Sequence, residues 1–112
     1  MTAPNNVIVS HYENVDLYQR ITDALQSAGK NLNAITVDDL PAVDEFHIGG
    51  IQATNDLLDQ LDIGPETRVL DIGSGLGGSA RHISSRYDAK VTGIDLTPDF
   101  VETAIRLTDL CK

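Results

Sequence analysis

Apolar residues keep helical spacing in two stretches of the first half of the chain. Between residues 15 and 28 they fall three or four apart, and Gly29 follows where a helix commonly ends in the left-handed conformation. The same spacing returns over residues 51–61. These patterns predict two amphipathic helices. A shorter helical segment is predicted between them, where Thr36 can act as the N-cap and Pro41 interrupts the helix.

The hydrophobic period changes in the second half of the chain. Residues 68–72 and 90–94 form short β-branched or aliphatic runs, which are typical of parallel strands buried on both faces. Residues 78–87, between these runs, can form a helix. A last helix is predicted after Thr97, the N-cap candidate, with Pro98 at its first position. Its predicted buried face comprises Phe100, Ala104, Leu107 and Cys111, flanked by Val101, Ile105 and Thr108.

This alternation of strands and helices predicts an α/β fold with a parallel sheet. Two strands alone leave open edges and an uncovered face, so a stable sheet of this kind needs further strands. The predicted fold is therefore the N-terminal part of a larger α/β domain, and the chain is expected to be a fragment or one piece of an assembly. We expect self-association or pairing with a missing C-terminal half.

Composition and charge disfavour several classes of protein. The sequence has 17 Asp and Glu residues against 8 Lys and Arg, and the basic residues form no stripe, so nucleic acid is not an expected partner. No apolar run is long enough to span a membrane and the polar N-terminus lacks a signal pattern, so a cytoplasmic location is expected. The single cysteine and the scattered histidines predict neither a disulfide nor a metal site.

The residues with the clearest chemistry follow the first predicted strand. A glycine-rich loop occurs there, at the end of the strand where ligands of open α/β sheets bind. Gly73, Gly75 and Gly78 satisfy the G-x-G-x-x-G spacing of dinucleotide sites. Asp71 argues against a dinucleotide, because its carboxylate would repel a pyrophosphate. S-adenosylmethionine has an ammonium, a carboxylate and a sulfonium instead of phosphates, and an acid beside backbone N–H groups suits those charges.

A second acid stands at the end of the second predicted strand. Asp95 follows the glycine loop by about twenty residues, a position from which a carboxylate can accept hydrogen bonds from both hydroxyls of a ribose. Leu96, the next residue, could lie against an adenine. Because dinucleotides also carry ribose, Asp95 indicates a nucleoside without distinguishing between the two kinds of ligand.

Two segments resemble the first two cofactor motifs of the class I S-adenosylmethionine-dependent methyltransferases. They are V-L-D-I-G-S-G-L-G-G at 69–78 and V-T-G-I-D-L at 91–96. The segments F-H-I-G-G at 46–50 and G-G-S-A-R at 77–81 resemble more narrowly the sarcosine/dimethylglycine and phosphoethanolamine N-methyltransferases. The resemblance implies a Rossmann-like methyltransferase domain of which residues 65–112 are the first, incomplete part. Residues 1–64 would form a helical lid or cap.

The resemblance also implies a cofactor, S-adenosyl-L-methionine, and a set of residues that bind it. An acid and the glycine loop would surround its aminocarboxypropyl group, a second acid would bind the ribose, and two residues before the double glycine would close the pocket. The cofactor-binding residues expected on this basis are Asp71, Gly73, Ser74, Gly75, Asp95, Leu96, His47 and Phe46. Arg81, by contrast, is expected to pair with an acid or to cover apolar surface with its stem.

The implied reaction is methyl transfer to a small-molecule acceptor, an amine or an amino-acid-like metabolite. Such a displacement depends on alignment and desolvation, so the sequence assigns no catalytic residue, and the chain alone is expected to be inactive. Three alternatives stay open. The acceptor could be a lipid, quinone or sterol; the chain could be a non-catalytic module that associates with another chain; or it could belong to a dinucleotide-dependent oxidoreductase.

Overall fold

A computed structural model describes residues 16–40 and 50–111 of the chain. The sites predicted at Phe46 and His47 lie outside these residues. The described elements are α2 (Leu17–Ser27), the 3-10 helices η1 (Leu32–Ala34) and η2 (Val37–Asp39), α4 (Gly50–Leu58), β1 (Arg68–Ile72), α5 (Gly78–Tyr87), β2 (Lys90–Ile94) and α6 (Pro98–Leu110). None of the helices in this part of the chain combines the length and the hydropathy needed to cross a membrane.

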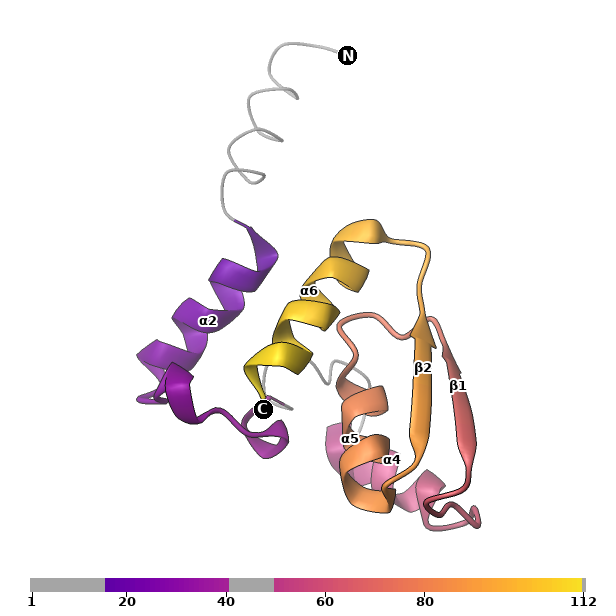
Figure 1. The fold of residues 1–112 in the computed structure, drawn as a ribbon. Helices are drawn as coiled ribbons and strands as arrows, with labels where there is room; N and C mark the ends of the chain where they lie inside the picture. Colours follow the sequence, from indigo (N-terminus) through magenta and orange to yellow (C-terminus); the bar gives the residue numbers. More distant parts are fainter. Residues whose placement is uncertain (1–15, 41–49, 112) are drawn as a thin grey trace.

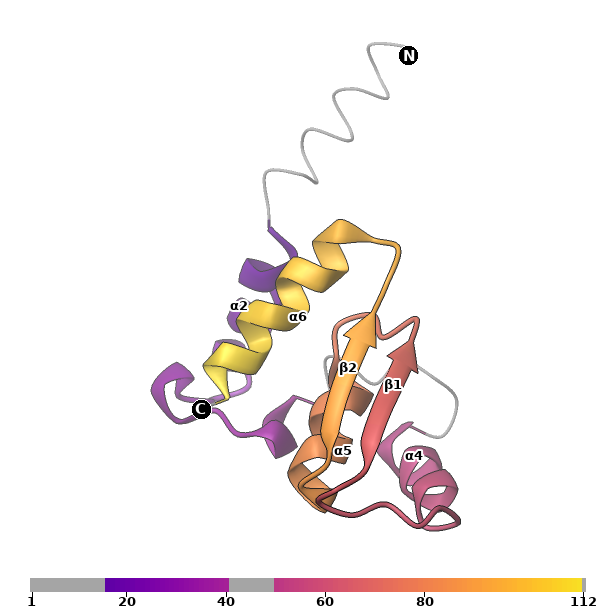
Figure 2. The same ribbon diagram turned by 45° about the vertical axis from the view of Figure 1, so that its right-hand side comes forward.

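The centre of the second half is a two-stranded parallel sheet, as the sequence predicts. β1 pairs with β2 in a register that sets Arg68 opposite Lys90 and Ile72 opposite Ile94. α5 connects the two strands and lies against β2, and both strands point toward the glycine loop and the turn before α6 (Figures 1 and 2). The α/β class and the bounds predicted for both strands and for α5 are confirmed.

One face of the sheet is packed and the other is open. Val69 and Val91 pack on a small core in which α4 and α5 meet, with Leu58, Ile83 and Ala89 as its buried members. On the opposite face, Leu70 is 58% exposed and Ile72 is 76% exposed. The open face agrees with the expectation that two strands alone leave one face of the sheet uncovered, although the apolar runs themselves are typical of strands buried on both faces. An apolar run specifies strands that can be buried on both faces, but burial also requires elements on each side.

A second core joins the N-terminal helices to α6. Its buried members are Ile21, Leu25, Ile35, Leu40, Leu76 and Leu107. Leu76 belongs to the glycine loop, so this core anchors the loop as well as the helices. α2 and α6 lie side by side in both ribbon views (Figures 1 and 2). Gly29 takes a φ of 84° where α2 ends, which confirms the predicted stop.

Two predicted buried faces differ from the structure. α4 ends at Leu58, three residues before the predicted end, and Leu61 is 53% exposed. In α6, Leu107 is fully buried, but Phe100 is 40% exposed and Ile105 is 59% exposed. Helical spacing identifies an apolar stripe, whereas the part of that stripe that becomes buried depends on which neighbours reach it.

An ion pair connects the beginning of α2 to α6. The Arg106 guanidinium donates to Asp16, the N-cap of α2, and lies 3.9 Å from the centre of the Tyr18 ring. The hydrogen bond from Arg106, followed by that from the Tyr18 backbone N–H, holds the pKa of Asp16 below its ordinary value. The ionised form of Asp16 is therefore the one that the folded protein favours.

Replacing Asp16 by asparagine is expected to lower the urea midpoint of unfolding at neutral pH. Asparagine retains an oxygen that can cap α2, so the substitution mainly removes the charge. A lowered folded-state pKa stabilises the protein fully above the unfolded pKa and is lost as pH falls through the folded value. The two proteins should therefore converge in acid. Asp23→Asn on the same helix is the control, and a difference that persists unchanged at low pH would contradict this account.

Candidate functional site

The glycine loop and the turn that follows β2 meet at the carboxyl ends of the two strands (Figure 2). The backbone N–H groups of Gly73 and Ser74 donate to the Ile94 carbonyl oxygen, at 2.8 and 2.9 Å. These two bonds continue the strand pairing beyond β1 and hold the loop against the end of β2. In a parallel sheet this edge is where ligands bind.

Asp95 ties the turn after β2 to the loop. Its Oδ2 accepts a hydrogen bond from the Gly75 backbone N–H at 2.9 Å, and its Oδ1 accepts one from the Thr97 N–H at 2.9 Å. These bonds, with that from Thr97 first, lower the pKa of Asp95 below its ordinary value. The site therefore presents an ionised carboxylate whose orientation is fixed at both oxygens.

The hydrogen bonds to Asp95 and Ile94 use the backbone N–H donors of the loop. The N–H groups of residues 73–75, which the sequence places near the cofactor's carboxylate, donate to the protein's own acceptors in this structure. α5 begins at Gly78, directly after the loop, and the first N–H groups of a helix have no acceptors within it. The start of α5 is therefore the better source of backbone donors for an anionic group.

Asp71 lies within β1 and faces the side of the sheet that the helices cover. It is half-buried, its Oδ2 atom is inaccessible to solvent, and its register partner on β2 is Gly93. The structure thus places the two predicted acids differently. Asp95 lies at the strand end in contact with the loop, whereas Asp71 lies one residue inside the last position of β1.

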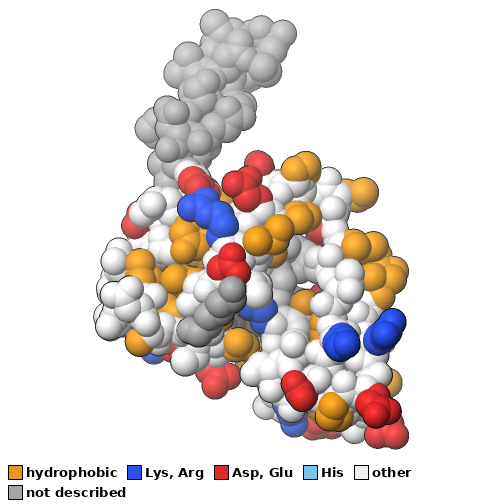
Figure 3. Space-filling model, viewed as in Figure 1, with side chains coloured by type: hydrophobic (Ala, Val, Ile, Leu, Met, Phe, Trp, Pro, Cys, Tyr) orange, Lys and Arg blue, Asp and Glu red, His pale blue; other side chains and the backbone are white. Residues whose placement is uncertain are grey.

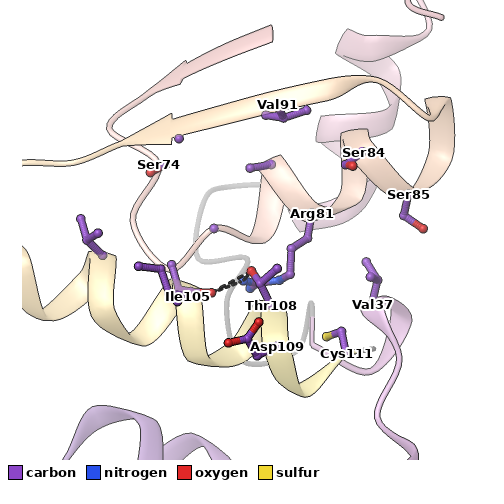
Figure 4. Close-up of a pocket in the computed structure, with 15 residues that line it drawn as sticks. Val37, Ser74, Arg81, Ser84, Ser85, Val91, Ile105, Thr108, Asp109 and Cys111 are labelled. Carbon is purple, nitrogen blue, oxygen red and sulfur yellow. Dashed lines mark hydrogen bonds between the residues drawn. The ribbon is translucent and has the colours of Figure 1, made fainter. Parts of the chain in front are cut away.

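The Ser74 side chain lies beside β2. It lines a cavity between α5, α6 and β2 (Figure 4). It also lies close to Gly93, because a Cβ atom at residue 93 would come within 2.8 Å of the Ser74 Oγ. Ser74 therefore fixes the loop on β2.

Leu96 is fully exposed, and two apolar residues near it in the sequence are partly exposed. Ile94 is 46% exposed and Phe100 is 40% exposed. Hydrophobic side chains reach the surface over the strands and the beginning of α6 (Figure 3). An apolar surface beside a fixed carboxylate suits a ligand with a planar apolar base and a polar sugar.

Arg81 is a residue whose place the sequence did not predict. It is 7% exposed, and its guanidinium reaches α6 across the wall of the cavity, whose volume is about 490 Å³ (Figure 4). The G-G-S-A-R segment gave a signal, since an arginine three residues after a double glycine faces the loop again after one helical turn. Its burial could not be inferred because the covering atoms belong to α6.

No group of three or more acidic, histidine or cysteine side chains within residues 16–40 and 50–111 could hold a metal ion. The described arrangement is a strand, a glycine loop, a helix and a second parallel strand that ends in an acid. This arrangement defines residues 68–110 as the first unit of a Rossmann-like domain.

Comparison with known proteins finds similarity to one family over this unit. Residues 69–110 match the family model described as a methyltransferase domain. The chain is 42% identical over 57 residues to a phosphoethanolamine N-methyltransferase of Triticum aestivum, covering 51% of this chain and 11% of the wheat protein. A phosphoethanolamine N-methyltransferase of Plasmodium falciparum is 41% identical over 56 residues, with 50% and 21% covered. These matches confirm the resemblance to class I S-adenosylmethionine-dependent methyltransferases over part of the chain.

Two further similarities were found. The glycine/sarcosine/dimethylglycine N-methyltransferase of Actinopolyspora halophila is 47% identical over 38 residues, covering 34% of this chain and 7% of that protein. A methyltransferase structure from Geobacter sulfurreducens is 30% identical, with 81% and 31% covered, and its TM-score of 0.41 describes only a loose superposition. The chain spans between 7% and 21% of the length of the three curated relatives named here.

Proposed function

We propose that the chain binds S-adenosyl-L-methionine at the ends of β1 and β2, as the cofactor part of a methyltransferase. The observation that carries the proposal is the Asp95 carboxylate, fixed between Gly75 and Thr97 at the end of β2. Each of its oxygens accepts one backbone hydrogen bond, and a carboxylate offers about four acceptor positions in all. The remaining positions suit the two hydroxyls of a ribose.

The other parts of the cofactor have matching surroundings in this proposal. Leu96 is exposed beside Asp95 and would lie against the adenine. The start of α5 would supply N–H groups to the cofactor's carboxylate, and Asp71 would favour its ammonium group from beneath the loop. When bound, the cofactor supplies an electrophilic methyl group on its sulfonium. The described residues bind and orient the cofactor, and the proposal gives none of them a role in proton transfer.

The acceptor proposed for the protein that carries this domain is a small amine or amino-acid-like metabolite. This rests on the relatives, since two are phosphoethanolamine N-methyltransferases and one is a glycine/sarcosine/dimethylglycine N-methyltransferase. A quinol is the second candidate, because a 2-methyl-6-phytyl-1,4-hydroquinone methyltransferase of Synechocystis is 48% identical over 44 residues. Residues 65–112 are proposed as the first part of the cofactor domain, and residues 1–64 as its cap.

Calorimetric titration with S-adenosylhomocysteine tests the cofactor proposal, with NAD as the matched comparison. Saturable binding of S-adenosylhomocysteine without binding of NAD is expected, because the Asp71 carboxylate, just before the glycine loop, would repel a pyrophosphate. Dispersed NMR amide signals establish that the protein is folded in the same sample. A folded protein that binds neither ligand, or prefers NAD, would overturn the proposal.

A further inference from the structure

The buried Arg81 side chain joins α5 to α6. Its Nη1 donates to the Ala104 carbonyl oxygen and lies within hydrogen-bond distance of the Thr108 Oγ1, both at 3.3 Å. The Thr108 hydroxyl donates in turn to the Ala104 carbonyl oxygen at 2.8 Å. One guanidinium nitrogen thus contacts a backbone and a side-chain oxygen one turn apart on the same helix. The Arg81 guanidinium and the Thr108 side chain lie next to each other in the close-up (Figure 4).

The same guanidinium lies against the glycine loop. Arg81 N donates to the Gly77 carbonyl oxygen at 2.9 Å, and a Cβ atom at residue 77 would lie 3.0 Å from Arg81 Nη1 and 3.3 Å from the Ala104 Cβ. Gly77 is buried and has a φ of 83°, a conformation that side chains other than glycine rarely adopt. The loop, the guanidinium and α6 therefore meet at Gly77, where a side chain would be strained by the backbone conformation and would press on both neighbours.

Apolar packing does little to fix the distance between α5 and α6. The cavity between them has walls from both helices and from β2, with Ala80 and Ser84 on α5 and Val101 and Ile105 on α6. Of these wall residues, Ser84, Val101 and Ile105 are exposed and Ala80 is half-buried. A gap of this kind lacks the close side-chain contacts that normally hold two helices in place. The Arg81 hydrogen bonds therefore contribute more to fixing the position of α6 relative to α5.

The position of α6 matters for the proposed cofactor site. α6 begins at Pro98, directly after the turn in which Thr97 donates to Asp95. α5 begins directly after the loop in which Gly75 donates to the same carboxylate. A shift of α6 relative to α5 would thus move Asp95 relative to Gly75.

We infer that Arg81 is a positioning residue for the cofactor site: its bonds to α6 keep the Asp95 carboxylate within reach of the Gly75 N–H. The inference rests on the proposed function and deepens it, because it assigns the geometry of the ribose-binding acid to a side chain that does not itself face the ligand. Arg81 acts on the ligand through Asp95. When the Asp95 carboxylate is removed, substitution of Arg81 should therefore have a smaller effect on the affinity for the ligand.

The test compares Arg81→Met with Arg86→Met. Both arginines belong to α5, but Arg86 is exposed and bonds to Asn55 and Asp59 instead of α6. Methionine keeps an apolar stem and removes the donors. Arg81→Met is expected to weaken S-adenosylhomocysteine binding about tenfold, as expected for hydrogen bonds to a charged group, whereas Arg86→Met changes it less than about twofold.

Two readouts separate positioning from a general structural role. In an Asp95→Asn background, Arg81→Met should weaken binding by less than about twofold, because interacting sites are non-additive. The Gly75 and Thr97 amide resonances should shift in Arg81→Met and stay in place in Arg86→Met. If Arg81→Met does not fold, Thr108→Val, which removes an oxygen that Arg81 Nη1 contacts, replaces it in both measurements.

The outcomes are distinguishable. Absence of S-adenosylhomocysteine binding by the unsubstituted folded protein would overturn the proposed function and the inference together. Two results would overturn the inference alone. In the first, the unsubstituted protein binds and Arg81→Met binds equally well. In the second, the losses of affinity caused by Arg81→Met and Asp95→Asn add up in the double variant. Non-additive loss together with shifted Gly75 and Thr97 resonances would establish it.

Discussion

Replacing Asp95 by asparagine is expected to weaken S-adenosylhomocysteine binding about 100-fold, because it removes charge-assisted hydrogen bonds to both ribose hydroxyls. The amide also presents an N–H₂ group where the carboxylate accepts from Gly75 or from Thr97, so one of these bonds is lost as well. Calorimetric titration of both proteins measures the change.

Asp99→Asn is the matched control for this substitution. Asp99 is an exposed acid in the first turn of α6, close to Asp95 in the sequence, and its loss should change binding less than about twofold if distance and fixed orientation decide the effect. Because folding lowers the pKa of Asp95, its carboxylate is ionised at neutral pH. It becomes protonated only when the pH falls through the pKa that Asp95 has in the folded protein. Equal affinities of Asp95→Asn and the unsubstituted protein at neutral pH would show that Asp95 does not bind the ligand.

Replacing Gly93 by alanine is expected to destabilise the protein by about 2 kcal/mol, because the new methyl group overfills a packed contact. A Cβ at residue 93 would lie 2.8 Å from the Ser74 Oγ and 2.9 Å from the Ser74 Cβ. Ser74 belongs to the loop that donates to Ile94, so the loop has to move away from β2. Urea unfolding measures the stability, and calorimetry measures the accompanying loss of S-adenosylhomocysteine binding.

The double variant Ser74→Gly, Gly93→Ala gives this prediction its sharpest form. It removes the atoms that the alanine meets, so it should recover most of the stability lost in Gly93→Ala. Gly64→Ala is the control, because no atom lies within 4 Å of a Cβ built at that glycine. If the double variant is less stable than Gly93→Ala alone, the contact between Ser74 and residue 93 is not the cause.

Local signals were sufficient to predict the elements that form the site. β1, β2 and α5 have the predicted bounds because short apolar runs and a glycine-rich junction mark them directly. The acid at the end of β2 also lies where its position in the sequence placed it. These features depend on neighbours within a few residues along the chain.

Features that depend on distant contacts could not be predicted in the same way. Phe100 and Ile105 belong to the predicted apolar face of α6, yet the packed elements cover only the part that includes Leu107. The burial of Arg81 depends on Ala104, 23 residues away in the sequence. The glycine-rich sequence predicted that the N–H groups of the loop face a ligand. In the structure, Ile94 and Asp95 accept hydrogen bonds from three of these groups.

The hydrogen bonds from the loop to Ile94 and Asp95 have a consequence for the kinetics of ligand binding. Gly73, Ser74 and Gly75 are already held by acceptors on the β2 side, so the entropy lost in ordering the loop belongs to folding and is not spent again when a ligand arrives. A ligand therefore encounters a formed surface and exchanges water for protein contacts. Differences in affinity among related ligands should consequently appear in how long each stays bound more than in how fast it arrives.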